Sequence, residues 1–89
     1  MRFPEVETQI SSPTELTEIL RNAKQCIADG TLQQIKPGNA PFAVDDLTVV
    51  PDEGPWPDYL EAHFVDHNGR RYKLIVETYH GAGGSWGRA

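Results

Sequence analysis

The sequence predicts a small α+β domain in which one amphipathic N-terminal helix packs on an antiparallel sheet of three to four strands that ends in a β-hairpin. Three observations lead to this prediction. Residues 13–29 carry apolar side chains at helical spacing, residues 59–79 contain two strand-like runs joined through Asn-Gly, and 89 residues leave room for only one hydrophobic core. We therefore expect a single domain over residues 1–80, followed by a glycine-rich tail over residues 81–89.

The helix over residues 13–29 has clear start and stop signals. Ser12 offers a capping hydroxyl, Pro13 suits the first helical position, and Glu15 follows the cap by three residues. Gly30 can adopt the left-handed conformation that often ends a helix. At 3.6 residues per turn one face is apolar and is expected to enter the core, and its members are Leu16, Ile19, Leu20, Ala23, Cys26 and Ile27.

The hairpin joins strands over residues 59–66 and 71–79. Asn68-Gly69 is typical of a type I′ turn, in which both central residues have positive φ. A turn centred there places His63 opposite Leu74. Each face of the hairpin then mixes apolar with polar side chains, so the pattern does not decide which face is buried.

Two further strands and one connection complete the predicted domain. Residues 42–50 contain a β-branched run that Pro51 ends, which favours a strand. Residues 3–10 alternate in polarity, and Pro4 restricts this strand to an edge or a late start. Residues 31–41 are interpreted as a packed connection that ends in a turn.

The formal net charge of −5 is unevenly distributed, because residues 30–69 hold seven acids against Lys36 alone. An acidic chain of this kind argues against nucleic acid and against anionic membranes as partners, since both require a basic face. There is no apolar run of the roughly 18 residues that a membrane span needs. The N-terminal residues lack the apolar stretch of a secretory signal, and Cys26 is the only cysteine, so we expect a cytoplasmic protein.

The chain shows no catalytic or metal-binding motif, and we expect neither a metal nor a cofactor. His63 and His67 are spaced like helical zinc ligands, but in a strand four residues span about 13 Å. The run that begins at His80 and continues as Gly-Ala-Gly-Gly-Ser lacks the helix of a phosphate-binding loop and the serine elbow of a lipase-like hydrolase. Carboxylates are abundant, but no nucleophile, base and orienting group can be named together.

A protein-binding surface is the function that the sequence favours. Acidic and aromatic side chains gather within residues 45–61, and aromatic residues on loops are frequent interface anchors. We expect a partner with a basic surface, and the candidate contact residues are Asp45, Asp46, Asp52, Glu53, Trp56, Asp58, Tyr59 and Glu61. Whether Trp56 and Trp86 are core or exposed stays open.

In general character, as a short acidic chain without catalytic residues, the protein is similar to small bacterial inhibitor or immunity-type proteins, which neutralise a partner. This resemblance implies a non-enzymatic role. The alternative is a small-ligand or enzymatic domain that uses Glu77, Tyr79, His80 and the glycine-rich C-terminal segment. A third hypothesis is a subunit that pairs through an exposed edge strand. The sequence leaves the oligomeric state and the strand order undecided.

Overall fold

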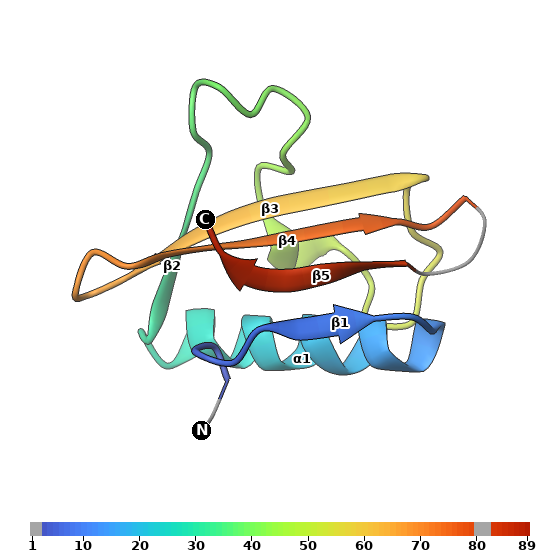
Figure 1. The fold of residues 1–89 in the computed structure, drawn as a ribbon, viewed down its shortest axis with the longest axis horizontal. Coiled ribbons are helices and arrows are strands. Elements are labelled where there is room, and N and C mark those ends of the chain that lie inside the picture. Colours follow the sequence, from blue (N-terminus) through green and yellow to red (C-terminus); the bar gives the residue numbers. More distant parts are fainter. Residues whose placement is uncertain (1–2, 80–82) are drawn as a thin grey trace.

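The computed structural model describes residues 3–79 and 83–89, and within them one α-helix covers one face of a five-stranded sheet (Figure 1). The strands run in the order β1-β5-β4-β3-β2, and every neighbouring pair is antiparallel. The predicted α+β class is confirmed, with five strands in place of three to four. In chain order the elements are β1 (Thr8–Ile10), α1 (Pro13–Ala28), β2 (Leu32–Ile35), the 3-10 helix η1 (Leu47–Val49), β3 (Tyr59–Asp66), β4 (Arg71–Glu77) and β5 (Gly83–Arg88).

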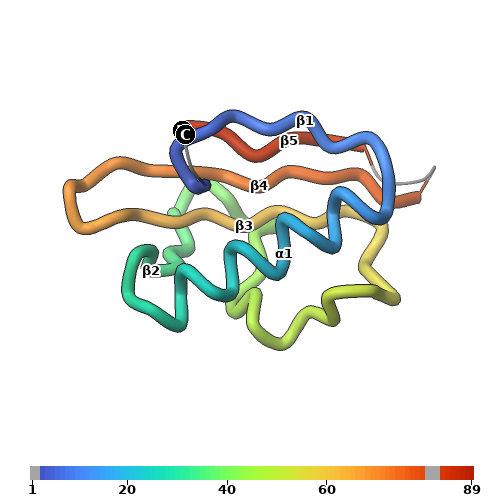
Figure 2. Tube along the Cα trace, turned by 90° about the horizontal axis from the view of Figure 1, so that it is seen from below, coloured from blue at the N-terminus to red at the C-terminus, as the bar shows by residue number. Residues whose placement is uncertain are grey.

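The start of α1 follows its sequence signals. The Ser12 hydroxyl accepts the Glu15 N–H at 3.2 Å, and Gly30 has a φ of 83° just beyond the last turn. The predicted apolar face is buried except for Ile27, which is half-buried against the core. Figure 2, seen from the helix side, shows α1 running obliquely beneath the sheet.

The β3–β4 hairpin is correctly predicted, but its turn is not of type I′. Gly69 has a φ of 83°, whereas no described residue other than glycine has a positive φ, and this includes Asn68. The Asp66 carboxylate accepts the N–H groups of Asn68 and Arg70, both at 2.9 Å. This side chain stabilises a three-residue turn in which only the glycine is left-handed.

The change of turn moves the strand register by one residue. His63 lies opposite Lys73, whereas the type I′ turn placed it opposite Leu74. Because side chains alternate between the faces of a strand, this step separates apolar from polar residues completely. The helix-facing side is now wholly apolar and buried, and consists of Leu60, Ala62, Phe64, Tyr72, Leu74 and Val76.

The predicted strand over residues 42–50 is wrong, since this segment contains η1 and irregular chain. The Asp46 carboxylate accepts both the N–H and the hydroxyl of Thr48, at 2.9 and 2.6 Å. Such local side-chain bonds compete with a strand ladder and favour a helical turn. A strand that was not predicted, β2, lies instead within residues 31–41, which were expected to form a connection.

The expectation that residues 81–89 form a tail outside the domain is wrong for residues 83–88, because β5 is an interior strand that pairs with both β4 and β1. Trp86 anchors it with no exposed surface, 4.5 Å from Phe3 and 5.2 Å from Phe64 between ring centres. Its indole N–H donates to the Pro4 carbonyl at 2.8 Å. Tail residues 81 and 82 lie outside the described residues.

Candidate partner-binding surface

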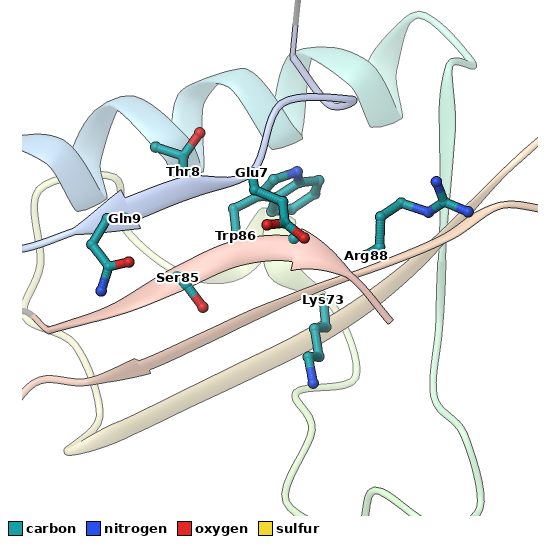
Figure 3. A pocket seen from close by; sticks show the side chains of 8 residues that line it. Glu7, Thr8, Gln9, Lys73, Ser85, Trp86 and Arg88 are labelled. Atoms are coloured by element: carbon teal, nitrogen blue, oxygen red, sulfur yellow. The ribbon is translucent and has the colours of Figure 1, made fainter.

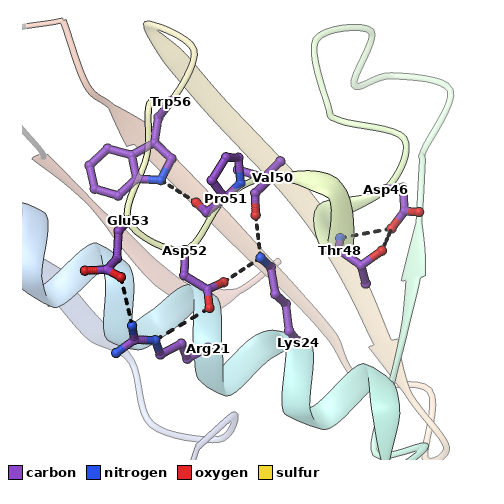
Figure 4. A network of polar contacts seen from close by, with 9 residues as sticks. All are labelled: Arg21, Lys24, Asp46, Thr48, Val50, Pro51, Asp52, Glu53 and Trp56. Atoms are coloured by element: carbon purple, nitrogen blue, oxygen red, sulfur yellow. Dashed lines mark hydrogen bonds and ion pairs between the residues drawn. The ribbon is translucent and has the colours of Figure 1, made fainter.

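The structure divides the predicted acidic surface into three separate parts. Asp52 and Glu53 face α1, where they form ion pairs with Arg21 at 3.5 and 3.4 Å (Figure 4). Lys24 donates from the same helix to the Asp52 carboxylate and to the Val50 carbonyl. The hydrogen bond from Lys24 is the main cause that lowers the pKa of Asp52 below its usual range. These two acids therefore attach the loop after η1 to the helix.

Trp56 belongs to the same attachment. Its indole N–H donates to the Pro51 carbonyl at 2.9 Å, and its ring is half-buried against the core (Figure 4). Neither of the two alternatives for Trp56, core or exposed anchor, holds in full. The side chain covers the edge of the core and keeps part of its surface in water.

The second part is the segment over residues 36–45, named here the 36–45 loop, which rises above the sheet on the face opposite α1 (Figure 1). Its base is closed by the ion pair between Lys36 and Asp45 at 2.7 Å. Gln34 reinforces the closure, because its amide donates to the Val44 carbonyl at 3.0 Å and accepts the Leu47 N–H at 2.7 Å. A loop with joined ends of this length resembles the compact Ω-loops that often carry function.

Inside the 36–45 loop the chain folds on itself. The Ala40 N–H donates to the Pro37 carbonyl at 3.0 Å, and the Ala43 N–H donates to the Ala40 carbonyl at 3.1 Å. Ala40 and Ala43 are buried, yet neither belongs to the core cluster between helix and sheet. Ala40 and Ala43 are therefore covered although they lie outside that cluster.

Two large apolar side chains between residues 42 and 49 are exposed. Phe42 is 77% exposed and Val49, on η1, is 76% exposed. Asp45 and Asp46 lie between them in sequence and are also exposed. We name these four residues the 42–49 surface. Phe42 and Val49 were not among the predicted contact residues, because both were expected in a strand. The turn residues just before Pro41 were the available signal that Phe42 lies on a loop.

The third part lies on the helix-free face of the sheet. The Tyr59 hydroxyl donates to Glu61 at 2.7 Å, and the other Glu61 oxygen lies 2.6 Å from His63 Nε2. Only 12% of the Glu61 side chain and 13% of the His63 side chain are exposed. Hydrogen bonds from His63 and then from Tyr59 lower the pKa of Glu61. Glu61, a predicted contact residue, is therefore mostly turned away from solvent.

Asp58 and the alternative C-terminal site lie at the far end of β3 and β4. Asp58 is exposed, and its carbonyl accepts the Thr78 N–H at 2.8 Å. Tyr79 is 69% exposed, and Glu77 is exposed beside it. His80, the third residue of that alternative, lies outside the described residues.

A shallow hollow of about 420 Å³ lies over β1, β4 and β5 (Figure 3). Lys73, Ser85 and Gln9 point toward it, and Gly87 also lines it. His63 sits two strands away from Ser85, at a Cα separation of about 12 Å from the usual strand spacings. A serine and a histidine at that distance cannot act as nucleophile and base.

In residues 3–79 and 83–89 there is no group of three or more His, Cys, Asp and Glu side chains that could hold a metal ion. The same residues include no helix with the length and hydropathy required to cross a membrane. Comparisons of the chain with protein-family models, curated proteins and solved structures give no match.

Proposed function

We propose that the protein binds another protein through the 42–49 surface, with the helix and sheet as its scaffold. The observation that carries this proposal is the exposure of Phe42, by about three quarters of its surface, on a loop whose base is closed; Val49, beyond the loop on η1, is exposed to the same extent. A large apolar side chain held in water gains free energy when a partner covers it. Scattered exposed apolar residues are common, but an aromatic residue on a folded loop is the usual form of an interface anchor.

The closed loop base supports binding in a second way. The Lys36–Asp45 ion pair and the bonds from Gln34 hold the loop before any partner arrives. An ordered loop loses less conformational freedom on binding, which favours affinity. The scaffold thus presents Phe42 in a prepared position.

The chemistry of the partner follows from the composition of the surface. Phe42 and Val49 require an apolar depression, while Asp45 and Asp46 suit lysine or arginine at its rim. The charge contribution is smaller than the sequence suggests, because four of the seven acids within residues 30–69 already lie beside a base: Asp45, Asp52, Glu53 and Glu61. We therefore assign most of the affinity to the apolar anchors and a supporting role to charge.

The remaining predicted contact residues take other roles in this proposal. Asp52, Glu53 and Trp56 hold the scaffold, whereas Asp58 and Tyr59 border the opposite end of the sheet. An inhibitor or immunity-type protein that acts on a basic partner is one form of the proposed function. Cys26, the single cysteine of the sequence, is buried and cannot form a disulfide within the chain, which suits a reducing compartment such as the cytoplasm.

A photocrosslinking experiment tests the proposal. The crosslinking amino acid p-benzoylphenylalanine replaces Phe42 in the source cells and, as a matched control, replaces Gln25, which is exposed on α1. We expect one crosslinked protein at position 42 that is absent at position 25. Equal crosslinking at both positions, or none at position 42, would contradict a partner on this surface.

A further inference from the structure

The hollow over β1, β4 and β5 contains a glycine that the backbone conformation does not require. Gly87 lies inside β5, opposite Lys73. Its φ is not positive, and a Cβ atom on it would make ordinary contacts of 3.4 to 3.6 Å with the Glu7 side chain. A glycine inside a strand weakens the strand, and it often marks a place where a ligand or another backbone approaches closely. Gly87 thus leaves room between Glu7 on one side and Lys73 on the other.

The charges of Glu7 and Lys73 flank this space without meeting. Both side chains line the hollow, and Figure 3 shows the Glu7 carboxylate over β5 while Lys73 extends from β4. Within the described part of the chain, neither forms an ion pair with the other or with a third side chain, although Lys73 attracts the Glu61 carboxylate at longer range. An ammonium group and a carboxylate in one hollow therefore leave a gap that a molecule with two opposite charges can bridge.

Ser85 and Gln9 add neutral hydrogen-bonding groups to the same hollow. Both side chains are exposed and point toward it (Figure 3). A serine hydroxyl and a glutamine amide can each donate and accept, so they suit either end of a zwitterion. The volume of about 420 Å³ lies within the range of about 300 to 1,000 Å³ that is usual for small-molecule sites. The hollow is therefore large enough for a small ligand, while its shallow shape limits the affinity.

We infer that this hollow binds a small zwitterion, with its carboxylate at Lys73 and its ammonium group at Glu7. The Ser85 hydroxyl and the Gln9 amide bind the charged ends or the polar groups between them. Because both protein charges remain in contact with water, each contributes little, and we expect a Kd of about 1 mM. The hollow shares no residue with the 42–49 surface, so this site does not depend on the proposed function.

An NMR titration of the full chain tests the site, at low ionic strength because salt screens exposed charges. The probe is 4-aminobutanoate, and acetate and methylammonium each supply one of its two charges. The amides of Lys73, Ser85 and Gly87 report binding. Gly87→Val fills the space between the two charges. Gly83→Val is the matched control, since Gly83 lies in the same strand outside the hollow and a Cβ atom there would meet no atom within 4 Å.

We expect 4-aminobutanoate to shift these amides in the wild type and in Gly83→Val, and acetate and methylammonium to bind at least about fivefold more weakly. The response should disappear in Gly87→Val. Lys73→Met should lose the response to acetate and keep the response to methylammonium, and it serves if Gly87→Val does not fold. Amides that ignore 4-aminobutanoate, equal binding of all three probes, or a wild-type titration in Gly87→Val or Lys73→Met would overturn the inference, whatever binds at Phe42.

Discussion

Replacing Gly84 with alanine is expected to destabilise the protein severely, because a Cβ atom at this position of β5 would overlap the backbone of β4. A Cβ atom on Gly84 would lie 1.9 Å from the Ile75 carbonyl oxygen and 2.7 Å from the Val76 Cα. Both neighbours are backbone atoms in the adjacent strand, so no side chain can rotate to make room. The strands would have to separate locally by more than 1 Å to restore ordinary contacts of about 3.4 Å.

The size of the effect follows from the bonds that such a separation disturbs. Gly84 pairs with Val76 on one side and with Ile10 on the other. A shift of this size breaks two or three ladder hydrogen bonds, each contributing about 1 kcal/mol, and opens the packing around the buried Trp86. We expect a loss of about 3 to 5 kcal/mol, against a total stability on the order of 5 to 10 kcal/mol for a domain of this size. The melting temperature should fall by about 15 °C or more.

Urea unfolding followed by the fluorescence of the tryptophans measures this loss. Gly83→Ala, in the same strand, is the matched control, since a Cβ atom at Gly83 would meet no atom within 4 Å. We expect the control to remain within about 1 kcal/mol of the wild type. If Gly84→Ala were as stable as Gly83→Ala, the segment would behave as a free tail and the placement of β5 would be refuted.

Two further predictions concern the hairpin turn and the loss of folding stability at acid pH. Gly69→Val should lower the unfolding free energy by more than about 1 kcal/mol, because valine resists the φ of 83° at this position; an unchanged urea midpoint would contradict the turn. The pKa of Glu61 is lowered from its ordinary 4.5 by hydrogen bonds from His63 and Tyr59, so its contribution to stability is present above pH 4.5 and is lost as the pH falls through the folded pKa. Between pH 5 and pH 3, urea midpoints should therefore fall less steeply for Glu61→Gln than for the wild type, and parallel profiles would show that the Glu61 carboxylate makes no such contribution.

The helix was predictable because its signals are local. Ser12, Pro13 and Gly30 act within one turn of the helix ends, and the apolar spacing between them needs no knowledge of the rest of the chain. The structure ends α1 at Ala28, one residue before the predicted end. Variation of one residue at a helix end is normal.

The hairpin shows how one side chain outside the turn changes a correct prediction. Asn-Gly indicated the place of the turn, but the Asp66 carboxylate selects another turn type through its bonds to Asn68 and Arg70. Because the strand period is two, this single-residue shift reassigns every side chain on one strand to the other face. The mixed faces of the type I′ register were the signal that it was incorrect.

The last strand and the exposed anchors depend on contacts that are distant in sequence. Glycines disfavour a strand locally, and β5 forms because its two neighbours and Trp86 hold it. The exposure of Phe42 likewise depends on the direction in which the 36–45 loop projects. That direction is set by β2 and β3, to which the two ends of the loop are attached. Of the predicted contact residues, Asp45 and Asp46 belong to the 42–49 surface. Side-chain contacts within the fold involve Asp52, Glu53, Trp56, Tyr59 and Glu61, and Asp58 is exposed.

The central claim, that the 42–49 surface binds a protein partner, is tested most directly by calorimetric titration of the crosslinked partner with Phe42→Ala. We predict a loss of about 2 kcal/mol or more, which corresponds to roughly 30-fold weaker binding, with an unfolding free energy within about 0.5 kcal/mol of the wild type. Tyr79→Ala, which removes another exposed aromatic residue outside this surface, should bind as the wild type does. Wild-type affinity in Phe42→Ala would contradict the claim.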